Sequence, residues 1–109
     1  MPEVRRLTIR LSGGLDQSTL ERLRADLGLR RRGRLTDVED WEFGYRALDG
    51  STAMLRLWRF EDTRWAITLD SAYADTPGDS EVAELAELAE QSARRAGFTI
   101  VDRIIGAPA

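Results

Sequence analysis

Three consecutive runs of alternating apolar and polar residues constrain the fold more than any other feature of this sequence. They cover about residues 41–46, 51–60 and 65–70, and Asp49-Gly50 between the first two is a good hairpin turn. A second turn separates the last two runs. Because the side chains of a strand point alternately to its two faces, such alternation predicts β-strands. The region therefore predicts a three-stranded antiparallel meander.

The segments on either side of the meander predict one strand and one helix each. Residues 4–11 alternate as a strand does, and residues 98–105 resemble a last strand. Apolar residues with helical spacing predict helices from about residue 16 to 27 and from about residue 80 to 96, each followed by a glycine. The expected order is β-α-β-β-β-α-β.

This order predicts an α+β two-layer sandwich, with both helices on one face of the sheet. No repeat, linker or low-complexity segment divides the chain, so residues 1–109 are expected to form a single domain with a short tail at about residues 106–109. The strand order stays open, since the first and last strands either pair or lie on opposite edges.

The absence of three residue types excludes much catalytic chemistry. The chain has no histidine, cysteine or lysine. Histidine is the usual general base near neutral pH, and cysteine supplies nucleophiles and thiolate metal ligands. Carboxylates remain, but their spacing indicates no catalytic pair or metal site. The sequence therefore predicts a protein that is not an enzyme and takes no cofactor or metal.

The composition also indicates a source and a compartment. All 16 basic residues are arginine and asparagine is absent, which indicates a GC-rich, bacterial genome because lysine and asparagine have AT-rich codons. The net charge is −3, with residues 1–34 net basic and residues 35–109 net acidic. No signal-peptide pattern and no membrane-length apolar run occurs, which predicts a cytoplasmic protein with no membrane partner.

Four arginines lie within five residues, as Arg30, Arg31, Arg32 and Arg34. Such a cluster could grip phosphates, in nucleic acid or another anion, or an acidic protein surface. A solvated connection after a helix would have the same composition. No aromatic residue between residues 12 and 40 is available to stack on bases. The hypothesis that follows from this run is that its four arginines bind an anion.

The middle strand of the meander offers a second candidate. If Leu55 and Leu57 face the core, Arg56 and Trp58 point away from it. Arginine and tryptophan are enriched among the residues that dominate binding energy in protein interfaces. The alternative is that the tail, a loop or a second copy of the chain simply covers this face.

The last helix carries an acidic series at Glu81, Glu84, Glu87 and Glu90, either a solvated face or a surface for a basic partner. The leading hypothesis is a non-catalytic bacterial protein-binding domain. Its partner-binding residues are predicted to be Arg56, Trp58, Glu84 and Glu87.

An immunity or inhibitor role, neutralising a basic toxin or enzyme, is the specific form of this hypothesis, by analogy of size and charge. Two alternatives stay open. One is a nucleic-acid or anion-binding module that uses the Arg30–Arg34 run. The other is a homo-oligomeric structural subunit, such as a homodimer.

Overall fold

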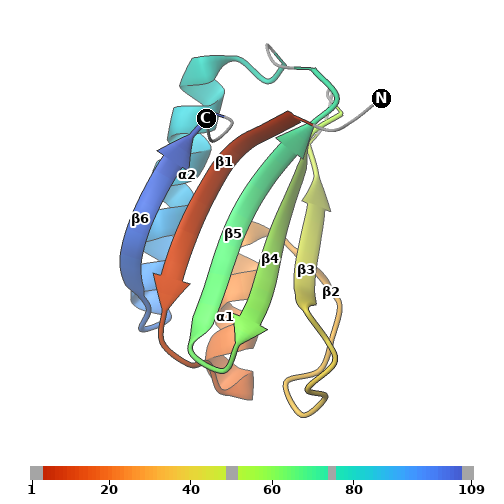
Figure 1. Cartoon of the computed structure of the whole chain (residues 1–109), viewed down its shortest axis with the longest axis vertical. Helices are drawn as coiled ribbons and strands as arrows, with labels where there is room; N and C mark the ends of the chain where they lie inside the picture. Colours follow the sequence, from red (N-terminus) through yellow and green to blue (C-terminus); the bar gives the residue numbers. More distant parts are fainter. Residues whose placement is uncertain (1–3, 49–51, 74–75, 107–109) are drawn as a thin grey trace.

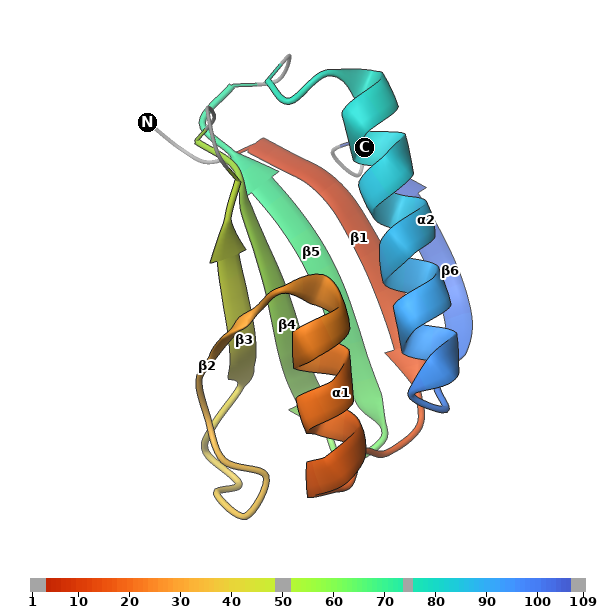
Figure 2. The same ribbon diagram turned by 180° about the vertical axis from the view of Figure 1, so that it is seen from behind.

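The computed structural model describes residues 4–48, 52–73 and 76–106, which form a two-layer α+β fold (Figure 1). The strands form one antiparallel sheet in the order β2-β3-β4-β5-β1-β6. Both helices lie on the same face of the sheet (Figure 2). The elements are β1 (Val4–Ser12), α1 (Gln17–Leu27), β2 (Arg30–Arg31), β3 (Glu42–Ala47), β4 (Met54–Glu61), β5 (Arg64–Ser71), α2 (Asp79–Arg95) and β6 (Thr99–Ile105).

The predicted fold class is confirmed, and the sheet has one strand more than expected. The meander is β3, β4 and β5, and β1 pairs with both β5 and β6, which decides between the two strand orders left open. The added strand is β2, in which Arg30 pairs with Tyr45 and Arg31 with Gly44 of β3. The turn expected at Asp49-Gly50 lies outside the described residues.

The core lies between the helices and the face of the sheet that they cover. In α1, Leu20, Leu23 and Leu27 point inward, whereas α2 packs mainly through small residues, which lets this helix approach the sheet closely. Each large apolar side chain buried here stabilises the fold by about 1.5–3 kcal/mol. The largest fully buried side chains are Phe43, Leu7, Ile9, Leu11, Leu20, Leu23, Leu27, Leu55, Leu57, Ile67, Leu69 and Val82.

Local sequence fixes both ends of α1. The Asp16 carboxylate accepts a hydrogen bond from the Thr19 backbone N–H at 2.8 Å, while Thr19 Oγ1 accepts one from the Asp16 N–H at 3.1 Å. This capping box satisfies two backbone donors at the start of the helix. Gly28, with a φ of 66°, ends the helix in the left-handed conformation and directs the chain into β2. The run of arginines that starts at Arg30 therefore follows α1 almost immediately in the chain.

A bulge in β3 changes the faces of its aromatic residues. Trp41, Phe43 and Tyr45 alternate in the sequence, yet Phe43 is buried in the core and Tyr45 pairs with Arg56 on the other face. The register shifts between Glu42 and Gly44, because one extra residue is inserted at this point. The side chains before the bulge therefore point to the opposite face from the one that unbroken alternation would give them.

The two edges of the sheet differ in length. One edge is β2, with two residues, and the other is β6, with seven.

In the part of the chain that the structure describes, neither helix has the length and apolar composition needed to cross a membrane.

Candidate functional site

The face of the sheet without a helix, called the open face below, is the first candidate site. Pairing places Trp58 beside Ala66 and Arg56 beside Thr68, and paired residues point to the same side of a sheet. Leu57, between Arg56 and Trp58, is buried on the covered face. On the open face lie Thr8, Arg10, Glu42, Tyr45, Met54, Arg56, Trp58, Ala66, Thr68, Asp70, Asp102 and Ile104.

The half-buried Trp58 is held in one orientation on this face. Its Nε1–H donates a hydrogen bond of 2.8 Å to Thr68 Oγ1, and the Arg56 guanidinium lies 5.8 Å from the centre of its ring. The polar edge of the indole is therefore satisfied within the protein. A fixed aromatic ring loses little conformational entropy when a partner covers it.

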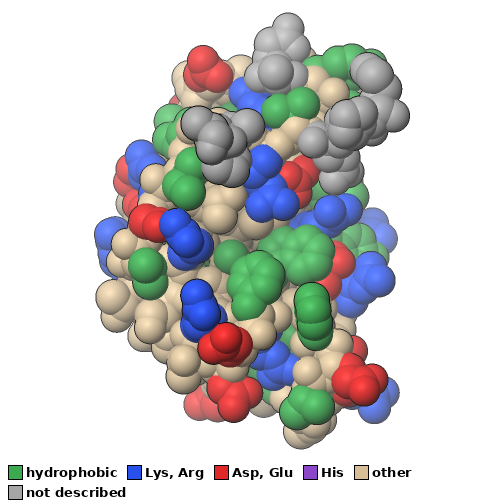
Figure 3. Space-filling view, viewed as in Figure 1, with side chains coloured by type: hydrophobic (Ala, Val, Ile, Leu, Met, Phe, Trp, Pro, Cys, Tyr) green, Lys and Arg blue, Asp and Glu red, His purple; other side chains and the backbone are tan. Residues whose placement is uncertain are grey.

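Apolar side chains extend this face toward one end of β4. Phe60 is 59% exposed and Val101 of β6 is 60% exposed. Together with Arg10, Arg64 and the buried Trp65 they line a cavity of about 340 Å³. Figure 3 looks onto the open face and shows hydrophobic side chains gathered near its middle, with charged side chains around them.

Three ion pairs on the open face join neighbouring strands. Arg5 donates to Asp70, and Arg10 binds both carboxylate oxygens of Asp102, at 2.8 and 2.5 Å. The hydrogen bond to Asp102 raises the pKa of Arg10 above its ordinary value. In addition, Arg56 lies 3.9 Å from Glu42. Each of these three pairs joins opposite charges, so together their six side chains add no net charge to the face.

The acidic residues predicted to share the interface lie on the other layer. Glu84 and Glu87 belong to α2, which packs against β1 and β6 on the covered face. Glu87 binds Arg103 at 2.8 Å, and Glu90, predicted as part of the same acidic face, is buried against Arg103 at 3.1 Å. Glu84 lines a separate cavity of about 370 Å³ with Leu48, Leu85 and Leu88. One flat partner surface therefore does not contact Trp58 and Glu84 together.

The basic run is divided rather than gathered into one cluster. Arg30 pairs with Tyr45, which faces the open side, whereas the next residue, Arg31, binds Glu21 of α1 on the helix side. Arg32 lies 3.9 Å from Glu42. The alternation of β2 thus sends neighbouring guanidiniums to opposite layers.

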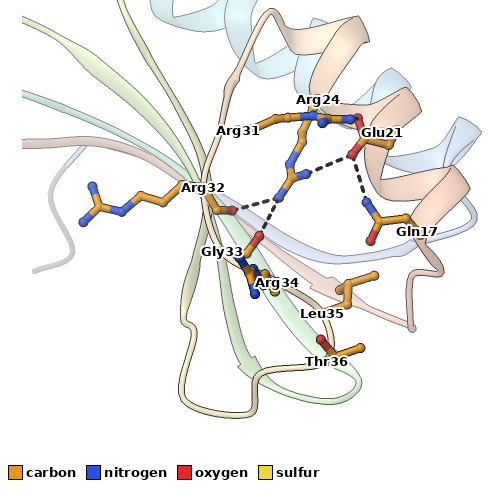
Figure 4. Close-up of a pocket in the computed structure, with 9 residues that line it drawn as sticks. All are labelled: Gln17, Glu21, Arg24, Arg31, Arg32, Gly33, Arg34, Leu35 and Thr36. Atoms are coloured by element: carbon orange, nitrogen blue, oxygen red, sulfur yellow. Dashed lines mark hydrogen bonds and ion pairs between the residues drawn. The ribbon is translucent and has the colours of Figure 1, made fainter.

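A third cavity, of about 460 Å³, lies where α1 meets the segment that follows β2 (Figure 4). The backbone N–H of Arg34 donates to Asp40 at 2.7 Å, which fixes the chain at this point. The residues that line this cavity are Gln17, Glu21, Arg24, Arg31, Arg32, Gly33, Arg34, Leu35 and Thr36.

Arg24 joins this cavity although the sequence did not single it out. Its side chain is 5% exposed and donates to the carbonyl oxygens of Phe43 at 2.7 Å, Arg32 at 2.8 Å and Gly33 at 3.3 Å. Glu21 accepts a fourth hydrogen bond at 3.2 Å. The signal that could have revealed Arg24 is its place four residues after Leu20, on the apolar stripe of α1.

The electrostatics of this cavity favour an added negative charge. Burial lowers the pKa of Arg24, and the charge of Arg31 lowers it further, whereas Glu21 opposes the change. The hydrogen bond from Arg31 in turn lowers the pKa of Glu21. Arginine stays protonated at any physiological pH, so Arg24 is a permanent, largely desolvated cation.

Comparisons with known proteins add no further constraint, because no protein family, curated protein or solved structure matches this chain.

Proposed function

We propose that this chain is a non-catalytic protein-binding domain that docks its partner on the open face. The observation that carries the proposal is the exposure of Phe60 and Val101, which line one cavity, on the sheet face that also carries the fixed ring of Trp58 and that no helix covers. Exposed aromatic and aliphatic side chains gathered at one place mark interaction surfaces in proteins.

The composition of the face fits a protein interface. Binding energy in such interfaces concentrates in a few central residues, with tryptophan and arginine enriched, and surrounding groups keep water out. Trp58 and Phe60 are the expected centre, with Arg56 beside them. The ion pairs Arg5–Asp70 and Arg10–Asp102 supply the polar surroundings.

The acidic residues of α2 support a more specific proposal, that the chain is an immunity or inhibitor protein of the bacterial cytoplasm. Glu81 and Glu84 are exposed on α2, and the chain carries a net charge of −3. Charges away from the contact surface still speed the encounter with an oppositely charged target. The negative charge thus favours a basic toxin or enzyme as the partner, approached through long-range attraction rather than direct contact with α2.

The experiment is affinity capture of the tagged protein from its bacterial host, with and without nuclease, followed by affinity measurement on the partner. We expect one stoichiometric protein to be retained after nuclease. Trp58→Ala and Phe60→Ala should each weaken its binding by about 30-fold or more, as for central interface residues.

Two valines provide a matched control. Val101 is 60% exposed on β6, whereas Val38 is 84% exposed in the loop between β2 and β3, outside the sheet. Val101→Ala should weaken binding and Val38→Ala should not. Binding that survives all three open-face substitutions but is lost in a Glu84→Gln/Glu87→Gln variant would move the contact to α2.

A second copy of the chain is the alternative occupant of the open face. Light scattering across a range of concentrations separates the two, because a face-to-face homodimer would double the mass of the wild type and not of Trp58→Ala. A set of partners that disappears with nuclease would instead favour the nucleic-acid alternative.

A further inference from the structure

The cavity between α1 and residues 31–36 is a second site, independent of the open face. Figure 4 shows the Arg24 guanidinium near its centre, with Arg31 and Arg34 on two sides, whereas the side chain of Arg32 extends away. Gln17 lies across the opening on the α1 side.

The floor of this cavity is rigid. Arg24 ties α1 to β3 through the Phe43 carbonyl and to the following loop through the Arg32 and Gly33 carbonyls. Gly33 has a φ of 77°, and a Cβ at this position would lie 2.6 Å from the carbonyl oxygen of Glu42. The loop conformation therefore depends on glycine and on one buried arginine, and both fix it before any ligand arrives.

The charge of the cavity suits a dianion. Three guanidiniums, those of Arg24, Arg31 and Arg34, line the cavity together with the single carboxylate of Glu21, which leaves an excess of two positive charges. Among the described residues, the side chain of Arg34 has no ion-pair partner, and that of Arg31 is 73% exposed above Glu21. A phosphate monoester carries about −1.5 to −2 charges at pH 7 and offers three oxygen acceptors.

We propose that this cavity binds a phosphate monoester group, held by the guanidiniums of Arg31 and Arg34 over the fixed base formed by Arg24. A planar guanidinium can donate two parallel hydrogen bonds to two oxygens of the same phosphate group. Glu21 acts as the positioning residue, since it accepts hydrogen bonds from Arg24, at 3.2 Å, and from Gln17, at 2.9 Å, and pairs with Arg31.

The test compares two double variants of equal charge. Arg31→Gln/Arg34→Gln removes two guanidiniums of the cavity. Arg30→Gln/Arg32→Gln instead removes the guanidinium of Arg30, which does not line the cavity, and that of Arg32, whose side chain extends away from it. Titration calorimetry at low ionic strength uses inorganic phosphate, O-phosphoserine and 5′-AMP as probes. We expect saturable binding by the wild type, a loss of about tenfold or more in Arg31→Gln/Arg34→Gln, and a change within about twofold in Arg30→Gln/Arg32→Gln.

Two results would overturn the proposal. One is the absence of saturable binding of all three probes. The other is an equal loss in both double variants, which would reduce the effect to net charge. All four arginines are exposed, so both variants should keep the wild-type thermal unfolding curve, which excludes misfolding as the cause. Whether O-phosphoserine or 5′-AMP binds more tightly then assigns the source of the phosphate, and neither result depends on a protein partner at the open face.

Discussion

On its covered face the sheet presents leucine, isoleucine and phenylalanine to two helices, whereas on its open face it presents arginine, acids and tryptophan to solvent. Both faces of the central strand β5 are nevertheless buried. Ala66, Thr68 and Asp70 point to the open side and are only 1%, 2% and 4% exposed. Long side chains from neighbouring strands cover them, through the Trp58–Thr68 hydrogen bond and the Arg5–Asp70 pair.

The difference between the two faces shows what a partner on the open face would replace. The covered face is closed by main-chain elements whose removal would unfold the protein. The open face is closed by individual side chains, each of which can be shortened while the layers stay in place. Substitutions on the two faces should therefore separate stability from binding.

The largest expected effect comes from the covered face, at Leu57 of β4. This side chain is 0% exposed, and Leu57→Ala should lower the free energy of unfolding by about 2–5 kcal/mol, since it leaves a cavity that the core cannot fill. Urea unfolding followed by circular dichroism measures the change. A loss below about 1 kcal/mol would show that the covered face is not the core.

Crowding the covered face should cost somewhat less. A Cβ on Gly44 would lie 2.9 Å from the Cβ and Cδ1 atoms of Leu29, so Gly44→Ala should cost about 1–3 kcal/mol. Gly14→Ala is the matched control, because the nearest heavy atom, the carbonyl oxygen of Asp62, is 3.9 Å away. Equal unfolding midpoints in urea for the two variants would contradict the close packing of Gly44 against Leu29.

On the open face, Trp58→Ala should reduce stability by less than half as much as Leu57→Ala. The half-buried ring loses its hydrogen bond to Thr68 and some packing, but no cavity forms in the core. The same urea experiment tests this. Losses of equal size at these two adjacent residues would make Trp58 a core residue and remove it from the proposed interface.

The Arg10–Asp102 pair should contribute least among the contacts of the open face. Both side chains are partly exposed, at 55% and 36%, so water and salt weaken their attraction. A double-mutant cycle with Arg10→Ala and Asp102→Ala should give a small coupling that decreases as salt is added. A large coupling that is insensitive to salt would mean that the open face is less hydrated than its exposure indicates.

Acid should lower the stability of the fold mainly through the helix layer, where Asp16 caps α1. Hydrogen bonds from Thr19 lower the pKa of Asp16, so its contribution is complete above the ordinary carboxyl pKa and is lost as pH falls through the lowered one. Asp16→Asn keeps a cap acceptor but does not titrate. The stability of this variant should therefore change less than that of the wild type between about pH 5 and pH 2. Identical pH dependence would exclude Asp16 as a source of acid sensitivity.

Regular alternation made much of this architecture predictable. The two-layer fold and the placement of Leu55 and Leu57 opposite Arg56 and Trp58 follow from period-two and helical spacing alone. The two-residue strand β2 is too short to show any period, and the β3 bulge reverses an alternation that looks unbroken in the sequence. These two features could not be read before the strand pairing was known.

The candidate sites were less predictable because they depend on contacts between distant segments. The division of the basic run follows from the pairing of Arg30 with Tyr45 and the contact of Arg31 with Glu21. Likewise, only the packing of α2 shows that Glu84 and Trp58 occupy different layers. Arg24 did leave a signal, as a charged residue on an apolar stripe, but its backbone acceptors come from β3 and the loop after β2.

The unequal edges of the sheet limit how copies of this domain could polymerise. A fibre needs two different edges that each accept a strand, so that every added copy exposes a fresh acceptor. In the described part of the chain, β2 offers two residues and β6 offers seven. Pairing between the β6 strands of two copies would use both long edges at once, so that growth would stop at two. With one short edge and one long edge, we therefore expect edge-to-edge pairing of this domain to end at dimers rather than to continue into fibres.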